Sequence, residues 1–316
     1  MRRFSILHMA IILLRDDSNY TAWSKALNHT APEIPVYTPE TVKDKSEITF
    51  ALSWKAPRGA YAEYPNLKAI SSMGAGADHL LEDDSIAEEI TLARIVDSKL
   101  AEDMGVFVLT ACLSAIRYFN DFFNQQADKN WQRYKYPQPQ DVTVGILGFG
   151  TLGQHVGKLL QQNGFNVIGY SHSRKDVLGI QSFTSDEMDG FLAQSQILIC
   201  LLPLNKHTQD ILNADLFSKL PEDAYLINVG RGGHLKEEDL IPAIENGNLK
   251  GATLDVFKTE PLPQEHPFWS HPGVFVTPHT ASISRPRALA SQVAENYARM
   301  EKGEDLKNIV SRKRGY

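Results

Sequence analysis

Three polar side chains of this 316-residue sequence follow apolar runs and have types that could act together in catalysis. Arg231 follows Ile-Asn-Val, Glu260 comes shortly after Asp-Val-Phe, and His279 follows Thr-Pro. A histidine can donate and accept a proton, a carboxylate can pair with it, and a guanidinium can hold a carbonyl or carboxylate. Taken singly, each could instead cap a helix, start a turn or lie at the surface. Their equivalent positions after successive predicted strands favour a catalytic site.

Such residues need a scaffold, and a glycine-rich loop indicates which one. The run from Val142 to Leu147 predicts a buried strand. Gly148, Gly150 and Gly153 then complete G-x-G-x-x-G, a helical pattern follows, and a second strand is predicted at Asn166–Tyr170. In a dinucleotide site these glycines allow a tight turn, close approach of a pyrophosphate and close helix packing. The order strand, loop, helix favours a cofactor site over a plain turn.

The segment after the second strand bears on the choice of cofactor. An NAD-specific site usually has an acidic residue about 20 residues after the loop. Here the strand is followed by Ser171, His172, Ser173, Arg174 and Lys175, with no acid until Asp176. Hydroxyl donors and positive charge suit a 2′-phosphate, so we predict NADPH over NADH, with Arg174 contributing most. The alternative is a solvated basic turn.

Strand and helix patterns alternate along most of the chain, which predicts an α/β fold of two Rossmann-like, doubly wound parallel-sheet domains. A helix is predicted over Ala101–Asp128, and another from Arg285 to Glu301. The length suits about two domains. The predicted strands are Ala10–Leu14, Ile34–Tyr37, Phe50–Trp54, Ala69–Ser72, Thr91–Ile95, Val142–Leu147, Asn166–Tyr170, Gln196–Leu202, Ala224–Val229, Gly251–Phe257 and Val274–Thr277.

Two features of the first half need interpretation. The run Phe4–Leu14 resembles a signal peptide, but no small-residue cleavage site follows and Arg15-Asp16-Asp17 ends it, so we predict a first strand. The loop Ser72–Asp78 follows a predicted strand and is rich in small residues. Its backbone N–H groups could form an anion-binding nest, or the loop could be an ordinary strand-to-helix turn.

Composition narrows the class of protein. The net charge of −6 gives no basic surface for nucleic acid or an anionic membrane. No apolar run approaches the roughly 20 residues of a membrane span. The two cysteines, Cys112 and Cys200, have no ligand spacing, so neither a metal site nor a disulfide is predicted. We expect a cytoplasmic enzyme that binds neither nucleic acid nor membrane.

Four motifs together resemble those of the D-isomer-specific 2-hydroxyacid dehydrogenases, over nearly the whole chain. They are the glycine loop, Asn228-Val-Gly-Arg-Gly-Gly233, Leu254-Asp-Val-Phe-Lys-Thr-Glu-Pro261 and Thr277-Pro-His-Thr-Ala281. Further details, such as Ser53-Trp54-Lys55 and the terminal Arg314-Gly-Tyr316, are most similar to bacterial glyoxylate/hydroxypyruvate reductases. Gly230 stands where the family commonly has Ser or Ala, which predicts a looser turn before Arg231.

The resemblance implies roles for particular residues. Arg231 would orient the keto acid, His279 would protonate its carbonyl oxygen, and Glu260 would pair with His279. The backbone of Ala75 and Gly76 would hold the substrate carboxylate, and Trp54 would line a small pocket. Asp255 would lie near the nicotinamide. The other cofactor residues implied are Gly148, Phe149, Gly150, Thr151, Leu152, Gly153, Leu202, Pro203, Val229 and Gly230, besides Ser171, His172, Ser173 and Arg174.

The resemblance also implies a domain plan and a reaction. Residues 1–105 and 286–316 would form the substrate-binding domain, and residues 106–285 the dinucleotide-binding domain. The expected reaction reduces small 2-keto acids with NADPH, or less well with NADH: glyoxylate to glycolate and hydroxypyruvate to D-glycerate. Alternatives are a dehydrogenase for another D-2-hydroxy acid and a nicotinamide-sensing protein without turnover. Aromatic residues near the long helix predict a homodimer; they are Tyr118, Phe119, Phe122, Phe123 and Trp131.

Overall fold

The computed structural model describes residues 9–313, apart from the side chain of Ser98, and the chain divides into two compact units. Within that range, unit 1 comprises the residues up to Asp97 and from Ser284, and unit 2 comprises Ser98–Ile283. The sequence placed the boundaries at 105/106 and 285/286. The first boundary lies earlier because helix α3 begins at Ser98. The predicted strand start at Phe4 and the terminal Arg314-Gly-Tyr316 lie outside the described residues.

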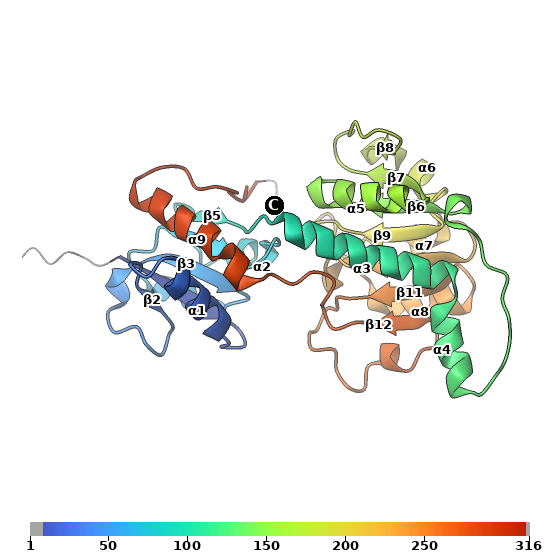
Figure 1. Cartoon of the computed structure of the whole chain (residues 1–316), viewed down its shortest axis with the longest axis horizontal. Coiled ribbons are helices and arrows are strands. Elements are labelled where there is room, and N and C mark those ends of the chain that lie inside the picture. Colours follow the sequence, from blue (N-terminus) through green and yellow to red (C-terminus); the bar gives the residue numbers. More distant parts are fainter. Residues whose placement is uncertain (1–8, 314–316) are drawn as a thin grey trace, which may run out of the picture. The chain divides into compact units, whose positions relative to one another are not determined.

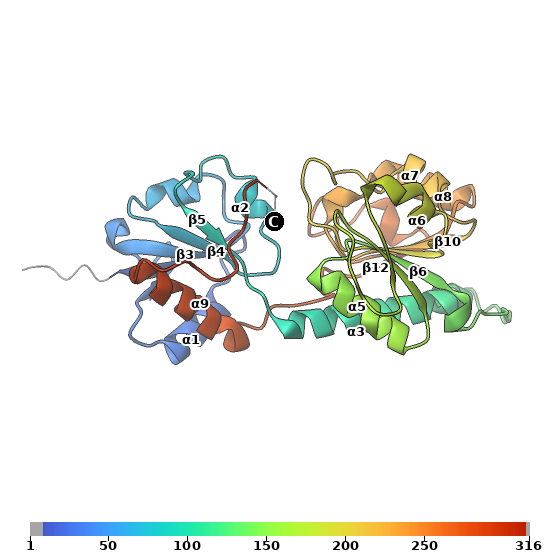
Figure 2. The same cartoon turned by 90° about the horizontal axis from the view of Figure 1, so that it is seen from above.

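Unit 1 is built on a parallel sheet whose strand order, within the described residues, is β2-β1-β3-β4-β5. Helices α1 and α9 pack together on one face of this sheet (Figure 2). Helix α9 begins with Pro286, whose fixed φ and missing N–H suit the first helical position. The elements are β1 (Ala10–Arg15), α1 (Thr21–Thr30), β2 (Val36–Tyr37), β3 (Ile48–Trp54), β4 (Ala69–Ser72), α2 (Asp78–Leu81), β5 (Thr91–Ala93) and α9 (Pro286–Glu301).

Unit 2 holds a larger parallel sheet with the order β12-β11-β10-β9-β6-β7-β8 in the described part of the chain. Helices α3 and α5 cover one face, and α6, α7 and α8 the other (Figures 1 and 2). The elements are α3 (Ser98–Ile116), α4 (Phe119–Ala127), β6 (Thr143–Leu147), α5 (Thr151–Gln162), β7 (Asn166–Tyr170), β8 (Gln181–Phe183), α6 (Met188–Leu192), β9 (Ile197–Cys200), α7 (Ala214–Ser218), β10 (Ala224–Asn228), α8 (Glu237–Glu245), β11 (Leu249–Leu254) and β12 (Val274–Val276).

The central strands of unit 2 are mostly apolar because helices bury both faces of the sheet. In β6, Val144 and Ile146 belong to the core shared with α3 and α5, whereas Leu147 belongs to the core on the opposite face. Helix α5 directs Val156 and Leu160, four residues apart, into the first of these cores. The predicted fold class, two Rossmann-like parallel-sheet domains, is confirmed.

The structure corrects the sequence prediction in two places. The single helix predicted over Ala101–Asp128 is two helices, α3 and α4, which are separated at Tyr118 with a φ of +58°. Contacts that no local pattern reveals hold that conformation: the Tyr118 ring lies 5.0 Å from the ring of Tyr134 and 3.4 Å from Nζ of Lys250. The short edge strand β8 was not predicted at all.

No helix in the described part of the chain combines the length and apolarity that a bilayer crossing demands.

Candidate active site

The carboxyl ends of the unit 2 strands lie level at one edge of the sheet. The pairing register aligns Leu147 of β6 with Cys200 of β9, and Cys200 with Asn228 of β10. It continues from Asn228 to Leu254 of β11 and from Leu254 to Val276 of β12. The predicted site segments of unit 2 begin directly after these residues. The structure therefore brings the glycine loop and the segments of Arg231, Glu260 and His279 to the edge where open α/β sheets bind ligands.

The glycine loop joins β6 to α5 and leaves space at the helix N-terminus. Gly148 has a φ of +112°, and a Cβ there would lie 2.6 Å from the backbone of Leu201, so only glycine fits. A Cβ on Gly153 would lie 2.3 Å from the Gly148 oxygen. At Gly150, the residue before α5, an added Cβ would meet nothing within 4 Å. The space beside Gly150, at the start of the helix whose first residues are Thr151 and Leu152, is therefore not filled by neighbouring atoms.

Phe149, a predicted cofactor residue, directs its side chain inward. The side chain is fully buried. Its ring packs against Gly169 so closely that a Cβ added there would lie only 2.3 Å from the ring. The Phe149 N–H donates to the Tyr170 oxygen at 2.8 Å. These contacts fix the loop against β7. Any contact of Phe149 with a cofactor is therefore through its backbone.

Glu260 and His279 form a hydrogen-bonded pair at the carboxyl edge of the unit 2 sheet. Nδ1 of His279 lies 2.9 Å from Oε2 of Glu260, and both side chains are partly buried. The other carboxylate oxygen of Glu260 accepts a hydrogen bond from the Phe257 N–H at 3.1 Å, which orients the carboxylate. With Nδ1 engaged, Nε2 is the His279 nitrogen that remains for proton exchange with a ligand. The predicted pairing of these two residues has the required geometry.

Asp255 holds the loop that carries His279. Its side chain is almost completely buried, and all three of its partners donate to it. Oδ1 accepts from the Thr277 hydroxyl at 2.6 Å and from the Thr280 N–H at 2.8 Å, and Oδ2 accepts from the Ala281 N–H at 2.9 Å. These bonds hold residues that precede and follow His279 in the sequence. Asp255 was predicted as a cofactor residue, and the structure gives it the geometry of a positioning residue.

Arg231 lies in a tight turn after β10. Its Nη1 donates to the Gly230 oxygen at 2.8 Å, and its N–H donates to Nδ1 of the fully buried His234 at 3.1 Å. A Cβ on Gly230 would lie 3.0 Å from that same Nδ1, so His234 packs closely against this turn. A Cβ on Gly232 would lie 1.8 Å from the carbonyl carbon of Phe257. The Arg231 turn therefore packs directly on the segment that leads to Glu260.

The segment after β7 holds Arg174 between two acceptors. Nη1 donates to the Ser182 oxygen at 2.6 Å, and Nη2 donates to Glu187 Oε2 at 2.8 Å. The Arg174 side chain remains more than half exposed. Hydrogen bonds from Arg174 and Thr184 lower the pKa of the Glu187 carboxyl group. Glu187 was not among the predicted site residues, although Thr184-Ser-Asp-Glu187 is a capping-box signature that marks the glutamate as ordered.

The remaining predicted residues near this edge differ in exposure. The Ser171 hydroxyl donates to the Ser173 oxygen at 2.9 Å, and Lys175 Nζ donates to the Ser173 hydroxyl at 2.7 Å, so this turn is held by its own polar groups. Of the predicted cofactor residues that follow β9 and β10, Pro203 is exposed, Leu202 is half-buried, and Val229 and Gly230 are buried. His172 is exposed.

Unit 1 brings its own predicted residues together. Trp54 ends β3, and a Cβ on Gly74 would lie 2.7 Å from its ring, so the indole lies against the loop Ser72–Asp78. The Trp54 ring also lies 5.0 Å from the ring of His79. In that loop the Gly76 oxygen accepts from the Ser72 hydroxyl at 2.6 Å. The predicted neighbours Trp54, Ala75 and Gly76 are therefore close in space.

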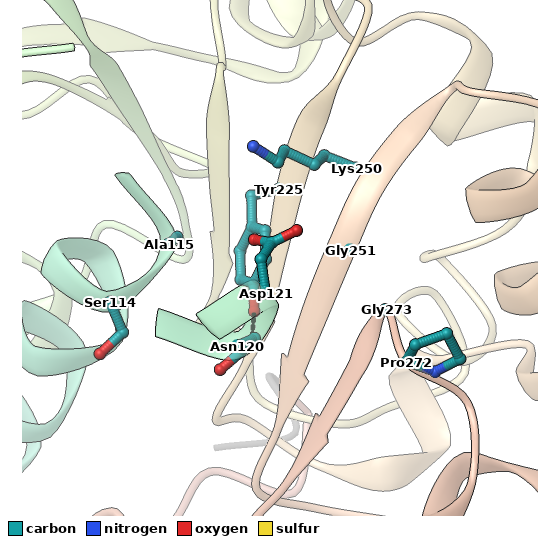
Figure 3. A pocket seen from close by; sticks show the side chains of 9 residues that line it. All are labelled: Ser114, Ala115, Asn120, Asp121, Tyr225, Lys250, Gly251, Pro272 and Gly273. Carbon is teal, nitrogen blue, oxygen red and sulfur yellow. Dashed lines mark hydrogen bonds between the residues drawn. The ribbon is translucent and has the colours of Figure 1, made fainter. Parts of the chain in front are cut away.

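A small hollow lies at the opposite, amino-terminal edge of the unit 2 sheet (Figure 3). Its volume is about 30 Å³, which is room for about one water molecule and far too little for a dinucleotide. The Tyr225 hydroxyl beside it bonds to Asn120 at 2.8 Å and to Thr253 at 3.0 Å. Burial raises the pKa of Tyr225 to about 12, so this hydroxyl stays neutral. The hollow is part of the packing of α4 against the sheet.

Residues 109–281 match the family model "D-isomer specific 2-hydroxyacid dehydrogenase, NAD binding domain". The chain belongs to this family and is a nicotinamide-dependent 2-hydroxyacid dehydrogenase. It is 38% identical to glyoxylate/hydroxypyruvate reductase A of Serratia proteamaculans over 98% of this chain and 100% of that protein.

Two solved structures are similar over 98% of this chain and all of theirs. A D-isomer specific 2-hydroxyacid dehydrogenase from Xanthobacter autotrophicus Py2, in complex with NADPH and MES, has a TM-score of 0.91 at 36% identity. An NADPH-dependent glyoxylate/hydroxypyruvate reductase from Sinorhizobium meliloti, in complex with NADP and sulfate, has a TM-score of 0.91 at 35% identity.

Proposed function

We propose that this protein reduces glyoxylate to glycolate and hydroxypyruvate to D-glycerate with NADPH. The observation that carries the proposal is the His279–Glu260 hydrogen bond of 2.9 Å, at the edge of the sheet that also holds the Arg231 turn and the glycine loop. The similarity to two glyoxylate/hydroxypyruvate reductases supports the choice of substrates. Unit 2 would bind the dinucleotide, and unit 1 would contribute to binding the keto acid.

Residues of unit 2 would bind and protonate the substrate during hydride transfer. A bound reduced nicotinamide would supply a hydride to C2 of the keto acid. His279, held through Nδ1 by Glu260, would give the proton on Nε2 to the carbonyl oxygen, which completes the 2-hydroxy acid. Arg231, with a planar fork of N–H groups, would hold the carbonyl and carboxylate oxygens of the substrate.

In unit 1, the amides of Ala75 and Gly76 would hold the substrate carboxylate, and the Trp54 ring would limit the size of the group attached to C2. The contact between Trp54 and Gly74 supports this division, because Gly74 directly precedes Ala75 and Gly76 in the loop. A small pocket of this kind favours glyoxylate and hydroxypyruvate over longer 2-keto acids.

A direct assay tests the reaction: the fall in NADPH absorbance on adding glyoxylate or hydroxypyruvate, with kcat/KM compared against longer 2-keto acids. The proposal predicts turnover of both substrates and formation of a D-2-hydroxy acid, which chiral chromatography identifies. Binding of NADPH without turnover of any 2-keto acid would instead support a nicotinamide-sensing protein. Turnover of only a longer keto acid would assign the enzyme to another D-2-hydroxy acid.

The choice of NADPH rests on the turn that contains Arg174. Two of its guanidinium nitrogens are held by Ser182 and Glu187, which restricts the side chain, and the exposed part carries further N–H donors for a 2′-phosphate. One charged hydrogen bond contributes about 1.5–3 kcal/mol. Arg174→Ala should therefore raise KM for NADPH about ten- to a hundredfold and leave NADH nearly unchanged. Equal weakening for both cofactors would contradict this assignment.

We also propose a homodimer that forms through an aromatic surface of unit 2. The exposed fraction is 55% for Phe123 on α4 and 90% for Trp131, and Trp269 borders the same groove as Phe123. Exposed aromatic clusters of this kind are typical of interfaces, and a second copy would bury both surfaces at once. Phe123→Asp should reduce the mass measured by light scattering from dimer to monomer. Leu178→Asp, at a leucine that is 95% exposed and lies between β7 and β8, is the control.

The free, buried thiols of Cys112 and Cys200 support a location in the reducing cytoplasm.

A further inference from the structure

His234 is a fully buried histidine beside the turn that carries Arg231, and the proposed reaction gives it no role. It ends a single helical turn, Gly232–His234, that follows β10. Its Nδ1 accepts a hydrogen bond from the Arg231 N–H at 3.1 Å. A backbone N–H can only donate, so Nδ1 carries a lone pair, and the imidazole is neutral with its proton on Nε2.

One peptide group separates this imidazole from the Arg231 guanidinium. The N–H of that group belongs to Arg231 and donates to His234 Nδ1. Its carbonyl belongs to Gly230 and accepts from Nη1 of Arg231 at 2.8 Å. The N–H and the carbonyl point in opposite directions because the peptide is trans. His234 therefore fixes the plane of this peptide, and the carbonyl at its other end holds the guanidinium. Hydrogen bonds in such a chain polarise and strengthen one another.

The two neighbouring peptide groups are held by Asn228, a second fully buried polar side chain. Its Oδ1 accepts from the Gly230 N–H, and its Nδ2 donates to the Arg231 oxygen, both at 3.2 Å. Three consecutive peptide groups of the turn thus have buried side chains as partners, and His234 holds the middle one. Without the acceptor at Nδ1, the Arg231 N–H would lose this partner and the middle peptide could rotate.

We propose that His234 is a positioning residue for the reaction, which orients the Arg231 guanidinium through the Gly230–Arg231 peptide. The proposal rests on the function proposed above, in which Arg231 holds the carbonyl and carboxylate oxygens of the substrate. Neutral His234 with its proton on Nε2 is the form that acts, because an imidazolium has no lone pair for the Arg231 N–H. Loss of the acceptor should impair use of the keto acid and leave NADPH binding unchanged.

Two variants separate the acceptor at Nδ1 from the volume of the side chain. His234→Leu has a similar volume but no acceptor, and His234→Asn supplies a side-chain oxygen close to the position of Nδ1. His234→Leu should lower kcat/KM for glyoxylate about ten- to a hundredfold, the effect of one charged hydrogen bond from Arg231 to the substrate. His234→Asn should recover much of that loss. Kd for NADPH should equal the wild-type value in both.

Ser195→Ala is the control for loss of a buried hydrogen bond elsewhere in unit 2. The Ser195 side chain is also fully buried, and its hydroxyl donates to the Phe191 oxygen at 2.8 Å. This variant should keep the wild-type kcat/KM. The proposal would be overturned if His234→Leu matched the wild type, if His234→Asn lost as much as His234→Leu, or if the affinity for NADPH fell by the same factor as kcat/KM.

A double-mutant cycle shows whether His234 acts through Arg231. Arg231→Lys removes the guanidinium, so adding His234→Leu to that variant should have little further effect. The same loss in both backgrounds would mean that His234 acts by another route. Calorimetric titration of the NADPH complexes with oxalate, a non-reacting dicarboxylate, gives the same comparison without turnover.

The tautomer of His234 is a readout that does not depend on the proposed function. Long-range proton–nitrogen spectra of protein labelled with nitrogen-15 at histidine should contain one set of signals with a bare Nδ1 and a protonated Nε2 that disappears in His234→Asn. A proton on Nδ1 of His234 would overturn the positioning role, whatever the substrate. If the wild type reduces neither glyoxylate nor hydroxypyruvate, the proposed function fails, and the tautomer and the oxalate cycle still decide the role of His234.

Discussion

Replacing Asp255 by asparagine should destabilise the protein by disconnecting the loop that carries His279. The carboxylate accepts three hydrogen bonds in a nearly solvent-free position, two at Oδ1 and one at Oδ2. Asparagine keeps one oxygen, which can replace Oδ1, but its NH₂ group must then face the N–H of Ala281. Two buried donors, the Ala281 N–H and the asparagine NH₂, then have no acceptor. Each costs roughly 1–3 kcal/mol, so we expect a loss of about 2–6 kcal/mol.

Denaturant unfolding measures this loss as a lower midpoint, and steady-state kinetics should show a fall in kcat because His279 is less well positioned. Thr277→Val is the matched control, since it removes one donor and leaves Asp255 two others. It should cost about 1–2 kcal/mol. The reasoning would be refuted if Asp255→Asn kept the wild-type midpoint and only raised KM for NADPH. That result would mean that Asp255 contacts the cofactor, as the sequence alone suggested.

Three further predictions concern single side chains. His279→Ala should lower kcat by roughly 10²- to 10⁴-fold, the usual range for a general acid, and near-normal turnover would end that assignment. Gly232→Ala should destabilise the protein by about 3 kcal/mol in denaturant titrations, because the new Cβ meets the Phe257 backbone. Gly150→Ala should keep the wild-type midpoint, because its Cβ meets no other atom, but the variant should bind NADPH more weakly. Burial raises the pKa of Cys200 to about 12, so raising the pH from about 7 to 9 should not make it react with Ellman's reagent until the protein unfolds.

Much of the site could be predicted from the sequence because parallel strands end at a common edge. Once Val142–Leu147 and the later apolar runs are recognised as strands, Arg231, Glu260 and His279 must follow neighbouring carboxyl ends. The glycine spacing likewise predicted a tight turn after the strand, and Gly148 has a φ of +112° there. These inferences need only local periodicity and the rule that crossover connections have one hand.

Only the tertiary structure shows which of the predicted side chains already make contacts within the protein. Asp255 and Phe149 both lie beside the predicted cofactor site, yet one binds the His279 loop and the other fills the space over Gly169. Glu187 reaches Arg174 from a separate strand-to-helix connection. Such contacts depend on the distance between segments far apart in the chain, which hydrophobic periodicity does not encode.

The break at Tyr118 and the position of Arg94 show the same limit. The helical pattern continues through residue 118, but packing against Tyr134 and Lys250 favours a left-handed residue there over a continuous helix. Arg94 belongs to no motif, and only the folded unit shows that its guanidinium donates to the Ala75 oxygen. The sequence by itself determined the fold class and the residue types at the strand ends. The packing of distant segments determined what each of those residues contacts.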